Sequence, residues 1–473
     1  MPKENKDDLL SLIRQGKPMT LRQQLRLTVQ LSTPAILAQL SVTIMQYIDA
    51  SMVGSLGANQ SASIGLVETT LWLMWGVCSA AATGFYVQVA HHIGGKRNKE
   101  ARSVLRQSIV SAFLFGLIMM LIGVSISPYL PGWLGGNADI VKDASTYFLI
   151  FSLFMPILLM EMLGAGMLRC SGNMFIPSML NILMCVMDVI FNFLLIFPSR
   201  TITILGQSLF IPGAGLAVKG AAMGTALAEV ITAILMLYFL CARSKELRLS
   251  LDKGSFIPTW SCIKKAFRIS FPMGLQHIVM CTAQITTTII VAPLGTFAIA
   301  ANSFGIVAES LCYMPGYGIS DAATTLVGQS TGAGRKDLMK RFAYICVIMG
   351  MIVMTVMGFI MYVAAPLMMG MMTPVEEIRE LGVMALRIEA FAEPMFAAAI
   401  VSYGVFVGAT DTIIPSGMNF FSMWAVRITL AAILAPIYGL KGVWIAMCVE
   451  LCFRGFIFLI RLRSGKWMNK AVV

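Results

Sequence analysis

Twelve predominantly apolar segments of membrane-span length divide the chain, with polar loops between them. They cover approximately residues 27–53, 64–90, 104–127, 145–168, 176–197, 217–241, 267–291, 304–328, 342–367, 384–408, 414–437 and 441–461. A helix needs about 20 apolar residues to cross the hydrocarbon core of a bilayer. Only 12% of the 473 residues are charged, whereas soluble domains carry about 25%. The sequence therefore predicts an all-α membrane protein with 12 transmembrane helices.

Lysine and arginine gather in alternate loops. The loops at 91–103, 242–266 and 329–341 are basic, as are both ends of the chain, whereas the loops at 54–63 and 292–303 contain neither residue. Because cytoplasmic loops are enriched in these residues, we predict a multi-pass protein of the cytoplasmic (inner) membrane with both termini in the cytoplasm. The basic loops account for the net charge of +12, but they are short and carry no readout module, which excludes nucleic acid as a partner.

The two halves of the chain repeat each other at an offset of 238 residues, which places Pro34 on Pro272 and Gly94 on Gly332. Further matches at this offset are Ser32 with Ser270, Leu56 with Leu294, Gly57 with Gly295, Arg97 with Arg335, Pro156 with Pro394, Gly166 with Gly404, Pro177 with Pro415 and Asn181 with Asn419. Later the offset falls to 222, because the first half has a longer loop with two β-prone pieces around Gly206.

Six spans in each copy give the copies the same orientation, and parallel repeats with substrate between them are a transporter layout. We therefore expect two parallel six-helix lobes. The predicted divisions are a cytoplasmic N-terminal segment (1–26), a first lobe (27–241), a cytoplasmic linker (242–266), a second lobe (267–461) and a cytoplasmic tail (462–473). Two interpretations remain for residues 9–27: a short amphipathic helix on the cytoplasmic surface, or a solvated polar segment.

The first copy carries acidic side chains inside its spans that the second copy lacks. Asp49 falls on Thr287, although a carboxylate at membrane depth costs at least ~2.5 kcal/mol. Asp188 and Asn192 are four residues apart and therefore share a helix face. The second copy has Val426, Leu430 and Met447 where the first has Asp188, Asn192 and Thr225. Their oxygens suit a hard cation such as Na⁺, and the carboxyl groups can instead carry protons. The alternative is a purely structural role in hydrogen bonds between helices.

Four short stretches carry a resemblance to a known family. They are "IDASMVGSLG" in the first span, "GMLRCSGNMFIP" after the fourth, "TTLVGQSTGAG" after the eighth and "GATDTIIP" after the tenth. Together they resemble the multidrug and toxin extrusion (MATE) transporters over nearly the whole chain. The resemblance implies two six-helix lobes that form a V and alternate between facing inward and outward. It also implies export of cationic, amphiphilic compounds driven by inward-moving Na⁺ or H⁺.

The same resemblance implies a cation- or proton-binding site in the first lobe, formed by Asp49, Asp188, Asn192 and Thr225. These residues would be the metal ligands if the protein is coupled to Na⁺. Here Asp precedes Asn in the fifth span, the reverse of the order in many bacterial members, but both lie on one face. The acid that some members carry in the seventh span is missing from "QHIVMCTAQ". The choice between Na⁺ and H⁺ stays open, and no other cofactor is expected.

Aromatic and acidic side chains within the spans are candidates for a substrate cavity, because aromatic faces and carboxylates attract flat cations. The candidates are Tyr47, Trp72, Trp75, Glu309, Asp321 and Glu393. Pro34 precedes Asp49 by 15 residues, so we predict a hinge there that couples the cation to cavity access. Glu450 is expected to pair with Arg454 one turn away, and Arg427 to neutralise an acid elsewhere in the second lobe.

The predicted function is a secondary active antiporter, acting as a monomer in the lipid bilayer on a cationic small-molecule substrate. The sequence contains no G-x-x-x-x-G-K-[ST] loop, so ATP is not the direct driver, and no H-E-x-x-H or nucleophile-elbow motif indicates an enzyme. The alternative is a flippase for a lipid-linked saccharide from the same superfamily. Such a flippase would need a cationic cavity for pyrophosphate, whereas the charges within the spans of the first lobe are mainly acidic.

Overall fold

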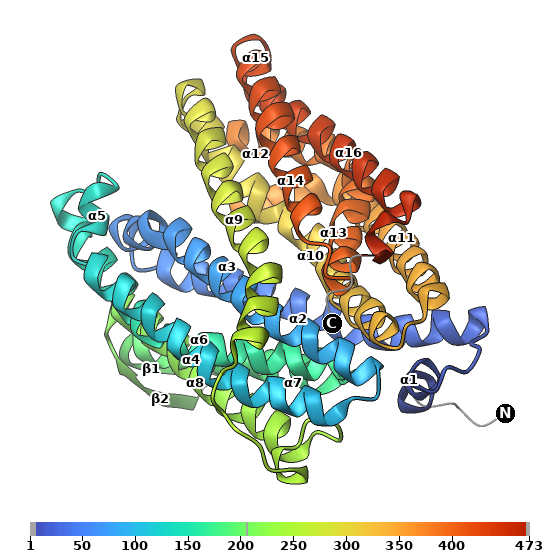
Figure 1. Cartoon of the computed structure of the whole chain (residues 1–473). Coiled ribbons are helices and arrows are strands. Elements are labelled where there is room, and N and C mark those ends of the chain that lie inside the picture. Colours follow the sequence, from blue (N-terminus) through green and yellow to red (C-terminus); the bar gives the residue numbers. More distant parts are fainter. Residues whose placement is uncertain (1–5, 205–206, 470–473) are drawn as a thin grey trace.

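Helices make up almost all of the molecule (Figure 1). The computed structural model describes residues 6–204 and 207–469. Within these residues, eleven helices are long and apolar enough to cross a membrane. The bent pair α12 (Glu376–Glu389) and α13 (Glu393–Gly408) adds a twelfth span when it is counted as one. The predicted all-α membrane fold with twelve spans is confirmed.

The first half of the chain forms one lobe. Its long helices are α2 (Leu21–Gly54), α3 (Ala58–Gly94), α4 (Asn98–Ile126), α6 (Ala138–Cys170), α7 (Phe175–Ile196) and α8 (Ala217–Tyr238). Its shorter elements are α5 (Leu130–Trp133), the strands β1 (Pro198–Ile204) and β2 (Gln207–Ala214), and the π-helical turn η1 (Phe239–Arg243). The strands pair antiparallel, as the two β-prone pieces of this loop predicted.

The second half forms the other lobe and starts after the linker. Its helices are α9 (Trp260–Val291), α10 (Thr296–Gly332), α11 (Lys336–Met372), α12, α13, α14 (Ile413–Phe421), α15 (Thr429–Tyr438) and α16 (Leu440–Ser464). Short turns of this half are η3 (Ala292–Leu294) and η5 (Lys466–Asn469), and the π-helical η4 (Ser422–Ile428) joins α14 to α15, while the linker before α9 contains the short turn η2 (Leu249–Leu251). The tenth span bends by 61° between α12 and α13.

The two lobes diverge at one end and meet at the other, as Figure 1 shows from the separated ends near α5 and α15. The first helix of each lobe also contacts the other lobe. α2 packs against α7 of its own lobe and against α10 of the other, while α9 packs against α3. A movement of one lobe relative to the other must therefore change the packing of α2 and α9.

The end where the lobes meet, here called the closed end, is formed by the last turns of α3, α6 and α10. Gly94 lies against the backbone of Gln329, and Gly332 lies against the backbone of His91, each so closely that a Cβ atom would collide. A ring nitrogen of His91 also lies 2.7 Å from the carbonyl oxygen of Gly408. Backbone contact between the lobes at this end is thus made possible by two glycines at equivalent positions of the repeat.

The N-terminal segment contains two helices, where the sequence left open either a short amphipathic helix or a solvated polar segment over residues 9–27. Helix α1 (Lys6–Gln15) ends before Gly16, whose φ of +74° favours glycine. Helix α2 then starts at a capping box: Thr20 Oγ1 accepts from the backbone N–H of Gln23 (3.3 Å), and Gln23 Oε1 accepts from the N–H of Thr20 (3.0 Å). The turn signals within "QGKPMT" separate these two helices, so no single helix extends over residues 9–27.

Candidate functional site

Three helices of the first lobe bring four predicted site residues together. Asp188 and Asn192 come from α7, Asp49 from α2 and Thr225 from α8. The Asn192 Nδ2 group lies 3.0 Å from Asp49 Oδ1 and 3.1 Å from Asp188 Oδ2, and Thr225 Oγ1 lies 3.4 Å away. The side-chain amide of Asn192 is therefore the centre of the cluster.

Local sequence explains this convergence. Asp188 and Asn192 are one helical turn apart, so both side chains project from the same face of α7. Gly224, the residue before Thr225, lets α8 approach, because a Cβ atom there would collide with Asn192 Oδ1. Sequence reasoning did not identify Gly224, although its position next to a candidate ligand was a usable signal.

The cluster is rich in acceptors and poor in donors. Asp188 and Asn192 are at most 1% exposed, and Asp188 Oδ1 and Asn192 Oδ1 have no hydrogen-bond partner in the part of the chain that the structure describes. Within the same residues, neither Asp49 nor Asp188 forms an ion pair with a basic side chain. Burial of a charge without a partner is costly, so the buried carboxylate of Asp188 is stabilised by either a proton or a bound cation.

The donor set fits a hard monovalent ion or protons better than a transition metal. It offers two carboxylates, one amide oxygen and one hydroxyl, which are ligands for hard cations. No group of three or more His, Cys, Asp or Glu residues suited to a metal ion occurs among the described residues. The geometry can thus hold Na⁺ or take up protons at one position.

Tyr47 of α2 lines a surface hollow of about 440 Å³ between α2 and α7. The guanidinium of Arg200 lies at the same hollow, 4.3 Å from the ring centre of Phe193 and 4.4 Å from that of Phe197. The wall of this hollow therefore contains aromatic rings, two of which, Phe193 and Phe197, are already in contact with the guanidinium of Arg200.

The two tryptophans assigned to a cavity lie in different surroundings. Trp72 is 49% exposed on α3. Trp75, less than one turn later, packs edge-on against Phe151 at a ring-centre distance of 5.9 Å and contacts the apolar core of the first lobe. The structure does not bring them together as one aromatic surface.

The three predicted acids of the second lobe also differ from one another. Asp321 forms an ion pair with Arg169 of the first lobe at 2.7 Å, so it joins the lobes at the closed end. Glu309 is 5% exposed on α10. Glu393 opens α13 directly after the bend, is fully buried, and has no partner for either carboxyl oxygen within the described residues. Among the described residues, Asp321 is the one of these three acids that forms an ion pair with a basic side chain.

Glu389 ends α12 on the other side of the bend and was not among the predicted site residues. It is also fully buried without partners among the described residues. Its spacing of four residues from Glu393 was the signal that could have identified it, because the two would share a face of a continuous helix. The bend thus separates two buried carboxyl groups.

The predicted charge pairs of the second lobe are confirmed. Arg454 lies 2.7 Å from Glu450, and Arg427 lies 2.8 Å from the same carboxylate. Glu450 is fully buried and also accepts a hydrogen bond from the Ser422 hydroxyl. This acid is therefore neutralised by two fixed cations.

Comparison with known proteins agrees with the sequence resemblance. A profile described as MatE matches residues 34–194 and 272–433. A probable multidrug resistance protein NorM of Thermotoga maritima is 26% identical, with 94% of this chain and 93% of the relative covered. A probable multidrug resistance protein NorM of Idiomarina loihiensis is 25% identical, with 92% and 93% covered.

Solved structures show the same fold. An outward-facing multidrug resistance MATE family transporter of the MOP superfamily superposes with a TM-score of 0.86 at 18% identity, covering 98% of this chain and 100% of the other. A MOP superfamily transporter from Pyrococcus furiosus, described as having a binding pocket of reverse polarity, gives 0.85 at 18% identity and covers 98% of both chains. At this identity the likeness extends to the fold alone.

Proposed function

The chain belongs to the MatE family, whose members are transporters and not enzymes, and on that premise we propose that it is a multidrug efflux antiporter. It exports cationic amphiphilic compounds from the cytoplasm across the bacterial inner membrane. Each export step is coupled to inward movement of Na⁺ or H⁺. The relatives named as probable multidrug resistance proteins support the export of drugs.

The observation that carries the proposal is the pair of carboxyl groups around Asn192, of which Asp188 is buried and Asp49 is half-buried. Asp49 and Asp188 share one amide group and no fixed cation among the described residues. Membrane burial disfavours such a pair unless a mobile cation or protons neutralise it. Binding of the coupling ion therefore changes the charge of the α2–α7–α8 junction, which is the change that an ion-driven transporter needs.

Helix α2 can transmit this change to the other lobe. It runs unbroken from Leu21 to Gly54 with Pro34 inside it, and proline removes one backbone hydrogen bond of the helix. One turn of α2 at Ala35 and Ile36 lies so close to Gly318 of α10 that a Cβ on Gly318 would meet its backbone. We propose that α2 bends near Pro34 when Asp49 changes its charge, which alters this contact and alternates access between the two sides.

The proposed cargo path lies between the lobes. Tyr47, Trp72, Trp75, Glu309 and Glu393 are its candidate contacts. Asp321 becomes available to a cationic cargo only when the lobes part, because Arg169 holds it at the closed end. Asp321 would then bind either Arg169, when the closed end is shut, or the cationic cargo, when the lobes have separated.

The test is transport in proteoliposomes with a Na⁺ gradient and a pH gradient imposed separately. The probe is ethidium, a lipophilic cation, and a lipid-linked saccharide is offered in parallel. Wild type should export ethidium under one of the gradients, whereas Asp49→Asn and Asp188→Asn should not. Asp139→Asn is the matched control, because Asp139 is an exposed acid in the first turn of α6.

Ethidium efflux that needs no gradient, or that survives both substitutions, would contradict the antiport mechanism. Translocation of the saccharide without ethidium efflux would favour the flippase alternative. A Na⁺ gradient that drives efflux without a pH gradient would identify the coupling ion.

A further inference from the structure

Helix α1 has an apolar face that is buried in the joint between the lobes. Leu9, Leu10 and Ile13 recur at helical spacing and are at most 2% exposed. They share one apolar cluster with Met174 of the first lobe and, in the second lobe, with Ile319, Leu326, Leu338 and Phe342. The position of α1 is therefore fixed by both lobes.

Contact with the first lobe is direct at the turn between α6 and α7. Gly172 has a φ of +96° there, and a Cβ atom on it would collide with the side chain of Leu10. The Nε2 group of Gln329 in the second lobe lies 3.6 Å from the same point. Leu10 of α1, Gly172 of the first lobe and Gln329 of the second lobe thus lie next to one another.

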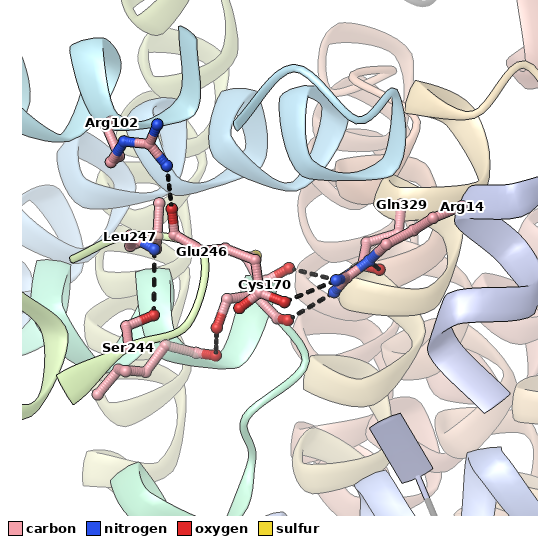
Figure 2. Close-up of polar contacts among 9 residues, drawn as sticks. Arg14, Arg102, Cys170, Ser244, Glu246, Leu247 and Gln329 are labelled. Atoms are coloured by element: carbon pink, nitrogen blue, oxygen red, sulfur yellow. Dashed lines mark hydrogen bonds and ion pairs between the residues drawn. The ribbon is translucent and has the colours of Figure 1, made fainter. Parts of the chain in front are cut away.

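Arg14, in the last turn of α1, connects three parts of the chain (Figure 2). Its Nη1 pairs with Glu246 Oε1 of the linker at 2.6 Å, and its Nη2 donates to the carbonyl oxygen of Ser171 in the first lobe at 3.0 Å. Its Nε donates to Gln329 Oε1 of α10 in the second lobe at 3.3 Å. The side chains of Arg14 and Glu246 are 17% and 18% exposed, so the ion pair is largely shielded from solvent.

The partners of Arg14 are themselves held in place. Gln329 is fully buried and donates from Nε2 to the carbonyl oxygen of Cys170 at 2.8 Å. The backbone oxygen of Glu246 accepts from Nη1 of Arg102 on α4 at 3.0 Å, as Figure 2 shows. Because Ser171 and Gln329 belong to different lobes, Arg14 cannot keep both bonds when the lobes separate at this end.

We propose that α1 is a strap that locks the closed end, with Arg14 as its point of attachment to both lobes. The strap stabilises the state in which this end is shut, and its release accompanies opening of the same end. This inference rests on the proposed alternating access. A guanidinium suits the position because its planar fork donates to several acceptors at once, which an ammonium on a flexible stem does not reproduce.

The test is hydrogen–deuterium exchange with mass spectrometry on the full-length protein in lipid nanodiscs. The variants are Arg14→Ala, Arg14→Lys and Glu246→Gln. Arg243→Ala is the matched control, because Arg243 lies three residues before Glu246 and its Nε donates to the hydroxyl of Tyr238. The peptides of interest cover residues 165–175 and 322–335, which form the first- and second-lobe sides of the closed end.

Arg14→Ala should raise exchange in both peptides by roughly 3- to 10-fold, the range expected for the net loss of one typical hydrogen bond. Arg14→Lys should have an intermediate effect, and Glu246→Gln a smaller one in the same direction, because it leaves α1 intact. Arg243→Ala should leave exchange unchanged.

Unchanged exchange in both Arg14→Ala and Glu246→Gln would overturn the strap. A rise spread over all helices would also overturn it, because that pattern reports general loosening. The exchange assay uses neither cargo nor gradient. The strap can therefore fail while wild type still exports ethidium, and the antiport proposal can fail in liposomes while the exchange difference stands.

Discussion

Equivalent interfaces of the two lobes hold their polar groups in opposite ways. In the first lobe, α7 and α8 surround Asp188, whose neighbours are the amide of Asn192 and the hydroxyl of Thr225. In the second lobe, η4 and α16 surround Glu450, which is paired with Arg427 and Arg454. One interface contains fixed cations, and the other contains none among the described residues.

This contrast separates structural acids from candidate ion-binding acids. Two guanidiniums neutralise the charge of Glu450 without a mobile ion, so this group connects its helices through fixed ion pairs. Asp188 has the same burial without that compensation. What distinguishes the two kinds of acid is whether a basic side chain pairs with them, and not the lobe in which they lie. Glu389 and Glu393 of the second lobe are also buried without partners among the described residues.

The largest expected effect is on stability, at the paired acid. Glu450→Gln leaves two buried guanidiniums without their carboxylate, and breaking such a group costs about 3–5 kcal/mol in free energy of unfolding. Chemical denaturation of the purified protein in detergent would measure it, with Asp139→Asn as a control that changes little. If Glu450→Gln unfolds with the same free energy as wild type, the ion pairs of Glu450 do not stabilise the second-lobe interface.

The next effect is on transport, at the unpaired acid. Asp188→Asn should reduce the initial rate of gradient-driven ethidium efflux by about 100-fold, or about 2.7 kcal/mol, while the free energy of unfolding changes by less than about 1 kcal/mol, because no fixed partner is lost. The two measurements are made on the same preparation. A stability loss as large as that of Glu450→Gln would assign Asp188 a structural role.

A smaller effect is expected from the glycine that lets α8 approach the site. Gly224→Ala places a methyl group against Asn192 Oδ1 and should weaken the apparent affinity for the coupling cation roughly tenfold, as a loss of about 1.4 kcal/mol would. The affinity is read from the cation dependence of efflux. Gly417→Ala is the control, because a Cβ there meets nothing within 4 Å. Equal effects of both substitutions would point to helix packing in general.

Thr225 should matter less, because its hydroxyl lies 3.4 Å from Asn192 Nδ2, the longest of the three contacts. A typical hydrogen bond contributes about 0.5–1.5 kcal/mol net. Thr225→Val should therefore lower the apparent cation affinity about threefold, and Thr225→Ser should restore it. If Val and Ser variants behave alike, the hydroxyl is not part of the site.

The smallest effect concerns a paired acid outside the spans. The hydrogen bond from Arg106 holds the pKa of Asp252 in the linker below its ordinary value. A lowered folded-state pKa contributes stability that is present above the ordinary value and is lost as the pH falls toward the folded one. Denaturation of wild type on the acid side of about pH 4 should show this loss, and Asp252→Asn should remove that part of the pH dependence.

The sequence alone predicted the spans and the repeat, because each depends on a periodicity of the chain, whereas the grouping of the four first-lobe residues came from the resemblance to the MATE family. Helical spacing places Asp188 and Asn192 on one face, and the offset of 238 residues isolates Asp49 as an unmatched acid. The role of these residues remains a prediction. The pair of Glu450 and Arg454 followed from the same helical spacing.

Other features depend on contacts between segments far apart in sequence, which periodicity does not encode. The spacing of Trp72 and Trp75 did not reveal that one is exposed and the other packs on Phe151. The 61° bend in the predicted span 384–408 lies just before Pro394, a residue suited to the first turn of a new helix. Arg14 contacts residues 157, 232 and 315 positions away, so its partners could not be inferred locally.

The backbone contacts of Gly94 and Gly332 have a consequence for how a duplicated chain can diverge. Each glycine faces a carbonyl of the other copy, at His91 and Gln329, which are themselves one repeat apart. Across this pseudo-twofold axis, the backbone of each half limits the size of the side chain that the other half can carry. A larger residue at Gly94 or Gly332 would collide with the backbone of the other half unless that backbone moves away. Substitutions at this contact therefore need matching changes in both halves, whereas residues far from the closed end can change in one half alone.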